Sequence, residues 1–232
     1  MTERFDIDSI DRAEVLRYLG HHGQELSDDL DDRLDAAMAA CLAQARPSGA
    51  WRVFDVDDAA SVPGRLCLVG TTLGLEGADI AHHLEGACAV GVMAVTLGAG
   101  VDQELRRLSL TDALGQVLLD ACATTLVERA ADACEARLVA EADRRGLFLN
   151  ARYSPGYGDL PLDAQRPLLA CLDAGRGLGL TLTASSLLVP TKSVTAVCGL
   201  FTAPRTRELC LCDKCHCHDF CTIRPTGRTC RG

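Results

Sequence analysis

The sequence predicts an α+β fold: a largely antiparallel, twisted sheet with packed helices, including one long helix, followed by a small cysteine-rich tail. Residues 89–97, AVGVMAVTL, form a nearly continuous apolar run that is typical of a central strand. Residues 111–145 have a helical pattern of unusual length with no internal proline. Helical and strand patterns are mixed without a regular βαβ repeat, which favours an antiparallel sheet.

The remaining elements follow from local signals. Ser27 precedes an acidic first turn and is expected to cap a helix that ends before Pro47. Proline at 161 is suited to open a helix. The sequence thus predicts helices over 10–19, 27–45, 77–84 and 161–172, and strands over 51–56, 147–152 and 191–201.

Composition excludes several classes of function. The 23 Lys and Arg residues against 32 Asp and Glu residues give a net charge of −9, which disfavours contact with a phosphate backbone. Aromatic residues make up only 4% of the chain, too few for a base-stacking platform. We therefore expect no nucleic-acid partner. The start of the chain is charged and no apolar run reaches the length of a membrane span, so we expect a cytoplasmic protein with no membrane partner.

The 13 cysteines fall into two groups. Seven are single residues among apolar neighbours, where a free cysteine packs as a small hydrophobic residue. The other six lie in the last 23 residues, beyond a change of pattern near Ala203 and Pro204. We therefore expect two parts, residues 1–203 and a cysteine-rich tail over 204–232.

The tail has the spacing of a metal site. A reducing compartment disfavours disulfides, and thiolates two to four residues apart can reach one tetrahedral ion. Four such thiolates suffice for zinc or an iron–sulfur cluster, and the spacing leaves both open. The thiols with this spacing lie between Cys210 and Cys221.

The segment 152–159, RYSPGYGD, combines a turn with a cation. Its proline fixes φ and its glycines permit positive φ and close approach of the backbone to another group. Arg152 leaves a predicted strand as the chain turns, and a guanidinium there can hold a carboxylate with two hydrogen bonds. Residue chemistry alone leaves two interpretations, a surface turn and a ligand site.

Several motifs resemble the activation domain of vitamin B12-dependent methionine synthase. Residues 152–157 are similar to that family's Arg-x-x-x-Gly-Tyr motif, and 180–196, LTLTASSLLVPTKSVTA, is similar to its Leu-Thr-Glu-Ser…Pro…Ser-Val-Ser stretch. Residues 10–20, IDRAEVLRYLG, resemble the start of its shorter, stand-alone members, and 94–98 adds AVTLG. The resemblance runs in order from about residue 4 to residue 201.

The resemblance implies an α+β fold whose shallow groove binds S-adenosylmethionine, with a partner's cobalamin docking over the same surface. It assigns Arg152 to the carboxylate of the ligand's methionine part and Gly156 and Tyr157 to the lining of the groove. Ser154 and Pro155 belong to the same loop and are included in the predicted site. The family's acidic residue near the N-terminus corresponds to Asp11.

The resemblance also assigns the metal ligands of the tail. Stand-alone members end in a similar Cys-x2-Cys…Cys-x2-Arg tail, which corresponds to Cys212, Cys215, Cys221 and Arg224. The expected ligands are therefore Cys212, Cys215, Cys217 and Cys221, with Cys210 as a rival to Cys217.

Glu128 is a further candidate on the long helix. It shares a stripe with Leu114, Val117, Ala121 and Thr124, which we expect to face packed structure. A carboxylate there needs a partner. Two partners remain open: an arginine of the chain, or the positive charge of the ligand's amino or sulfonium group.

The sequence also departs from the family pattern. The fused form carries a histidine after the Gly-Tyr pair, but residues 158–165 here are GDLPLDAQ. We therefore carry two hypotheses. In the first, the chain is an accessory protein that binds S-adenosylmethionine for reductive methylation of the cobalamin carried by a methionine synthase or another corrinoid protein, with an electron donor as a further partner. In the second, it is an iron–sulfur or zinc-binding interaction or electron-transfer module with a vestigial ligand groove.

Overall fold

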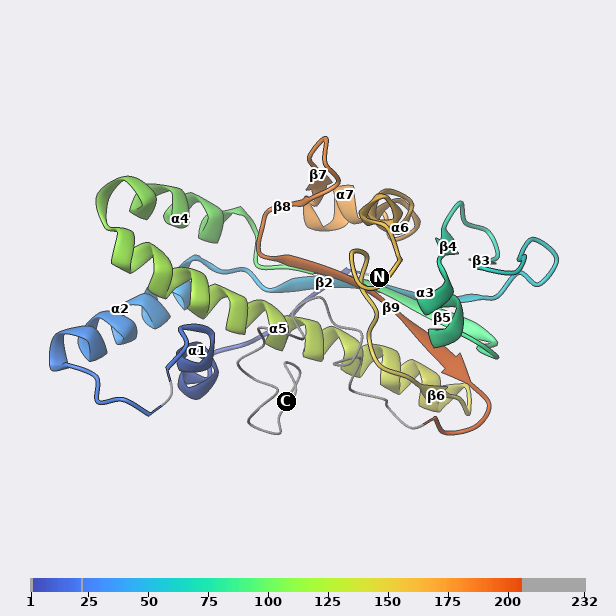
Figure 1. The fold of residues 1–232 in the computed structure, drawn as a ribbon, viewed down its shortest axis with the longest axis horizontal. Helices are drawn as coiled ribbons and strands as arrows, with labels where there is room; N and C mark the ends of the chain where they lie inside the picture. Colours follow the sequence, from blue (N-terminus) through green and yellow to red (C-terminus); the bar gives the residue numbers. More distant parts are fainter. Residues whose placement is uncertain (1, 22, 206–232) are drawn as a thin grey trace. The chain divides into compact units, whose positions relative to one another are not determined.

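A computed structural model of the chain describes residues 2–21 and 23–205. Its helices are α1 (Arg12–Tyr18), α2 (Asp28–Gln44), α3 (Ala78–His83), α4 (Ala99–Thr111), α5 (Ala113–Arg144), α6 (Gln165–Cys171) and α7 (Ala174–Leu178), with a 3-10 turn η1 (Leu162–Ala164). Its strands are β1 (Thr2–Arg4), β2 (Ser48–Asp55), β3 (Arg65–Cys67), β4 (Gly74–Glu76), β5 (Ala89–Thr96), β6 (Phe148–Leu149), β7 (Thr181–Leu182), β8 (Leu188–Val189) and β9 (Ser193–Phe201). Figure 1 labels the elements along the chain.

Five strands form the main sheet, in the order β1-β2-β5-β9-β6. The outer pairs β1–β2 and β6–β9 are antiparallel, with Thr2 opposite Ala50 and Phe148 opposite Phe201. All eight residues of β5 are buried, which confirms the central strand that its apolar run predicts. The two hairpins β3–β4 and β7–β8 are separate two-stranded sheets. The α+β prediction with a largely antiparallel sheet and one long helix is confirmed.

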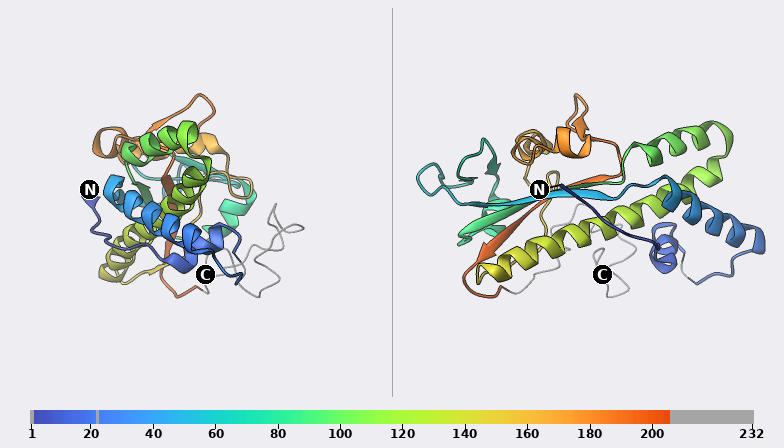
Figure 2. Two further views of the ribbon diagram at one scale, coloured as in Figure 1. Left: turned by 90° about the vertical axis from the view of Figure 1, so that its left-hand side faces the viewer. Right: turned by 180° about the vertical axis from the view of Figure 1, so that it is seen from behind.

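The chain divides into two compact units. Of the described residues, the first unit holds 2–21, 23–52, 93–137 and 168–195, and the second holds 53–92, 138–167 and 196–205. The division falls within β2, β5, α5, α6 and β9, so these elements contribute residues to both units. The first unit contains α1, α2 and α4; the second contains α3 and the hairpin β3–β4, drawn in teal (Figure 2).

Helix boundaries follow the capping residues. Ser27 accepts a hydrogen bond from the backbone N–H of Leu30 and opens α2, as predicted. Asp11 does the same for α1, accepting from the N–H groups of Ala13 and Glu14. Gly77 opens α3 without a side-chain cap of its own. None of the helices in the described ranges is both long and apolar enough to cross a membrane.

The buried side of α5 supplies much of the core. Fully buried side chains recur along it at helical spacing: Leu119, Cys122, Leu126, Ala130, Cys134 and Leu138. In the second unit, Ala142 packs with Ala89 and Leu200, and Val53, Leu147 and Leu149 lie against this cluster. Burial of this apolar surface stabilises the helix, since propensity alone contributes little.

Candidate functional site

The loop 152–159 lies in the second unit and has the turn that its proline and glycines predict. Gly156 and Gly158 have φ values of 93° and 50°, which disfavour any side chain at these positions. The N–H of Gly156 donates to the carbonyl of Leu160 at 2.8 Å, and the N–H of Tyr157 donates to the carbonyl of Ser154 at 3.1 Å. These bonds close the loop on itself and fix the direction of residue 157.

Arg152 lies between the end of β6 and this turn, where the sequence predicts it. The next residue, Tyr153, exchanges two backbone hydrogen bonds of 2.9 Å with Val197 of β9, so the chain is held to the sheet immediately after the arginine. Arg152 is half-buried. The predicted strand over 147–152 is shorter than expected, since β6 has only two residues and pairing resumes at Tyr153.

The loop presents one aromatic ring to solvent and buries another. Tyr157 is 52% exposed, whereas Tyr153 is 3% exposed. Their rings meet edge to face at 6.4 Å, and the Tyr153 hydroxyl donates to the Tyr157 carbonyl at 3.2 Å. Pro155 is buried and Ser154 is half-buried. The result is a firmly held turn with an accessible phenol close in sequence to a guanidinium.

Asp11 and Glu128 lie in the first unit, apart in sequence from the loop. The Asp11 carboxylate caps α1, accepting from Ala13 N at 2.9 Å and from Glu14 N at 3.3 Å. This contact accounts for an aspartate at this position without a ligand. Glu128 is half-buried on α5. Burial raises the pKa of the Tyr18 phenol, and the negative charge of Glu128 adds to the increase, so the two side chains are close enough to interact.

The prediction that the stripe containing Glu128 faces packed structure is wrong for its first two residues. Leu114 and Val117 are 43% and 54% exposed instead of packed, while Ala121 is buried. The reason is that α5 carries small apolar residues on several sides, so periodicity alone does not select the side that meets the core.

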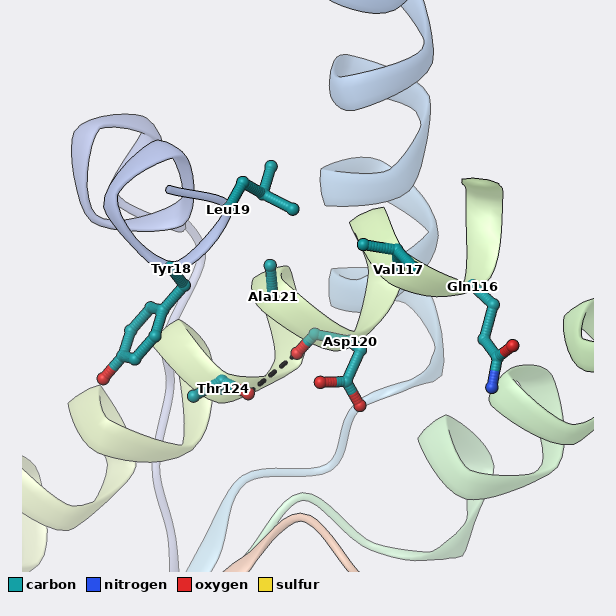
Figure 3. Close-up of a pocket in the computed structure, with 7 residues that line it drawn as sticks. All are labelled: Tyr18, Leu19, Gln116, Val117, Asp120, Ala121 and Thr124. Carbon is teal, nitrogen blue, oxygen red and sulfur yellow. Dashed lines mark hydrogen bonds between the residues drawn. The ribbon is translucent and has the colours of Figure 1, made fainter. Parts of the chain in front are cut away.

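This stripe borders a pocket in the first unit that sequence reasoning missed. The pocket has a volume of about 330 Å³. Its lining residues come from the end of α1 and from α5 (Figure 3): Tyr18, Leu19, Gln116, Val117, Asp120, Ala121 and Thr124. The Lys192 ammonium lies 2.9 Å from both the Asp120 carboxylate and the Thr124 hydroxyl. The pocket thus combines apolar walls with an acidic group that already has a cationic partner.

His82 and His83, adjacent residues of α3, lie in different environments. The His82 side chain is 79% exposed, whereas the His83 ring faces Ala151 and Tyr153. Over residues 2–21 and 23–205, no cluster of three His, Cys, Asp or Glu side chains is arranged to hold a metal ion. The predicted ligands Cys212, Cys215, Cys217 and Cys221 lie outside the described residues.

The fold of the chain is similar to that of a known protein domain. The chain resembles the crystal structure of the MetH reactivation domain bound to AdoHcy, with a TM-score of 0.63 over 90% of this chain and 80% of that chain. The sequence identity is 16%, so this likeness shows a common fold. A search of curated proteins gave no match.

A family model matches the chain directly. The model describes the activation domain of vitamin B12-dependent methionine synthase and matches residues 78–220, a range that includes Glu128 and the loop 152–159 but not Asp11. This range covers more than half of the 232 residues. The chain therefore belongs to the vitamin B12-dependent methionine synthase activation domain family.

Proposed function

We propose that the chain is an accessory reactivation protein that binds S-adenosylmethionine and serves the reductive methylation of cobalamin carried by a methionine synthase or a related corrinoid protein. The single observation that carries the proposal is the loop 152–157, a closed turn within the matched family range. Family membership supports the cobalamin-bearing module as the partner. AdoHcy, the ligand of the structural relative, is what remains of S-adenosylmethionine after it loses its methyl group.

In this proposal Arg152 recognises the carboxylate of the ligand's methionine part. A guanidinium offers parallel N–H groups that match a carboxylate, and such charge-assisted bonds are about twice as strong as neutral ones. The bridge between Tyr153 and Val197 limits how far the arginine's backbone can move. Tyr157, half-exposed on the same turn, would supply an aromatic wall next to the bound ligand.

The proposed reaction depends on the positioning of the methyl donor more than on acid or base catalysis. When bound, S-adenosylmethionine would supply its sulfonium methyl group to the partner's cob(I)alamin, which forms when cob(II)alamin takes up one electron from a donor; the S–CH₃ bond breaks, a Co–CH₃ bond forms, and AdoHcy with a neutral sulfur remains. The chain's own residues would bind and orient the sulfonium, an effect worth several orders of magnitude in rate. Glu128 is proposed to favour the ligand's positive charge. Asp11, whose carboxylate caps α1, is a proposed site residue on the family resemblance alone.

Calorimetric titration of the full chain with S-adenosylmethionine and with AdoHcy tests the binding site. We expect both to bind, and Arg152→Ala to weaken each by about 30-fold, because the ligand's carboxylate loses its hydrogen-bonded ionic partner. Arg65→Ala, which removes an exposed arginine from β3 in the same unit, is the matched control and should leave both affinities unchanged. Glu128→Gln should weaken the cationic ligand more than AdoHcy, which lacks the sulfonium charge.

Two results would count against this assignment. Equal affinities for wild type and Arg152→Ala would remove the arginine from the site. Equal losses for the two ligands in Glu128→Gln would assign that carboxylate to the ligand's amino group and not to the sulfonium, and no loss for either ligand would remove its electrostatic role.

We also propose that the tail, residues 204–232, binds zinc or an iron–sulfur cluster through Cys212, Cys215, Cys217 and Cys221. The support is the spacing of the thiols. A cluster would give an entry point for the electron that the reaction needs. Anaerobic purification followed by metal analysis and an absorption spectrum distinguishes the two: a coloured protein with iron and sulfide favours the cluster, and a colourless protein with one zinc excludes this electron route.

A further inference from the structure

Asp159, the last residue of the loop 152–159, joins this loop to helix α3 through hydrogen bonds. The Asp159 carboxylate accepts hydrogen bonds from the backbone N–H groups of Ala78 and Asp79, the latter at 3.1 Å. These are donors of the first turn of α3, which Gly77 leaves without a side-chain cap. Asp159 thus caps α3 as Ser27 caps α2, although it lies 81 positions after Ala78 in the sequence.

The start of the loop is hydrogen-bonded to His83, in the last turn of α3. The His83 Nε2 lies 2.9 Å from the carbonyl of Ala151, and because a carbonyl only accepts, Nε2 carries the proton. The His83 ring also packs on Tyr153 with a centroid distance of 5.0 Å. Ala151 and Tyr153 are the two neighbours of Arg152, so His83 contacts both sides of the proposed ligand-binding residue.

Asn150 links this end to the sheet. Its side-chain amide donates to the carbonyl of His83 at 2.9 Å, and its side-chain carbonyl accepts from the N–H of Gly199 in β9 at 2.7 Å. Asn150 is 5% exposed, so loss of either bond would leave a buried polar group without that partner. Figure 1 shows α3 and its neighbouring β4 in the second unit.

Close backbone packing joins the helix and the loop between these two ends. A Cβ on Gly158 would lie 2.3 Å from the Tyr153 hydroxyl and 2.6 Å from the Asp79 carboxylate. A Cβ on Gly77 would lie 2.3 Å from the Asp159 carboxylate. Helix α3 has only six residues, too few to be stable alone, so loop and helix stabilise each other.

We infer that Asp159, with His83 and Asn150, is a positioning residue for S-adenosylmethionine: its cap of α3 holds the loop in the conformation in which Arg152 and Tyr157 meet the ligand. The inference rests on the proposed function. A free loop must lose conformational entropy on binding, whereas a loop already held at both ends loses less, and this difference appears as affinity. Asp159 does not itself touch the ligand in this account.

The test compares Asp159→Ala, Asp159→Asn and Ser27→Ala in the full chain by calorimetric titration with AdoHcy, together with thermal unfolding. Asp159→Ala removes the cap and should weaken AdoHcy about tenfold. Asp159→Asn keeps an oxygen acceptor, and since Asn and Asp cap helices about equally well, it should stay within about threefold of wild type. Ser27→Ala removes a cap of the same kind in the first unit and should lower the melting temperature without changing affinity.

The outcomes separate the inference from the proposed function. A wild-type chain that binds neither AdoHcy nor S-adenosylmethionine overturns the proposed function. A wild type that binds, with Asp159→Ala of equal affinity, overturns the positioning inference alone, and so does an equal loss of affinity in Ser27→Ala. If Asp159→Ala fails to fold, His83→Phe tests the other end: it keeps a ring against Tyr153 but loses the bond to Ala151, and unchanged affinity there contradicts the inference.

Discussion

The cysteines of the first unit show how burial alone sets the chemistry of a side chain. Cys41 and Cys122 are fully buried. Burial raises the pKa of the Cys41 thiol to about 12 and that of Cys122 to about 11, because a thiolate would lose its hydration in the core. Both thiols are therefore neutral and unreactive at physiological pH, as expected for cysteines that pack as small hydrophobic residues.

These two thiols make the free energy of unfolding depend on pH above about 8.5, the pKa of a cysteine in an unfolded chain. Above that pH the unfolded chain releases protons that the folded chain keeps, so stability is constant below it and falls toward pH 11–12. The expected loss is roughly 1 kcal/mol per pH unit for each thiol. Urea denaturation between pH 7.5 and 10.5 measures it.

Substitution of a buried cysteine separates its contribution to the pH dependence of stability from the contributions of other groups that titrate in the same range. Cys41→Ala should be less stable at neutral pH but should lose less stability on going to pH 10.5 than wild type. An identical slope in wild type and Cys41→Ala would show that this buried thiol does not produce the pH dependence.

At the level of elements, β5 packs against α5 at Gly91. A Cβ at this position would lie 2.9 Å from the Cδ2 of Leu138, a side chain that is fully buried. Gly91→Ala should therefore destabilise the protein by about 1–3 kcal/mol through overpacking. Leu138→Ala should cost about 2–5 kcal/mol through the cavity that it leaves.

The double variant gives the sharper result. The methyl group that Gly91→Ala introduces would occupy part of the space left by Leu138→Ala, so the combined cost should be smaller than the sum of the single costs, as measured by urea denaturation. Gly175→Ala, where a Cβ meets only the Leu180 carbonyl at an ordinary 3.6 Å, is the control and should add to Leu138→Ala without coupling. Strict additivity at Gly91 would contradict the described contact.

The elements that the sequence predicts best are those with a single dominant signal. The apolar run of β5, the Ser27 cap of α2 and the proline-free length of α5 each correspond to an observed element. Helix α4 was not predicted, because it begins at Gly98 with no side-chain cap and buries only Val101. A helix with so little apolar surface against the core leaves a weak periodic signal.

The candidate site shows the same division between local and distant signals. Proline and glycine predict the turn at 154–158 because their effect on φ is local. The anchor formed by Asp159 and α3 has no sequence signature, since the donors are backbone N–H groups about 80 positions away. For the same reason, nothing in the sequence singles out Asp120, whose partner Lys192 is far along the chain.

For the whole molecule, family membership and the loop lead to one functional account. The family match includes α3, Glu128 and the loop 152–159, and the fold resembles a reactivation domain whose ligand is AdoHcy. The net charge of −9 is consistent with a protein partner and disfavours nucleic acid. We therefore propose that the chain lets the methyl group of S-adenosylmethionine reach the cobalamin of a methionine synthase or a related corrinoid protein.

The direct measurement uses S-adenosylmethionine with a labelled methyl group, a cobalamin-bearing module in its cob(II)alamin state and a one-electron donor, with and without the chain. The account predicts that label appears on the cobalamin, together with the absorption spectrum of methylcobalamin, only when the chain is present, and that Arg152→Ala reduces the rate by at least about 30-fold. Equal labelling with and without the chain, measured with a wild-type chain that binds the ligand, would contradict it.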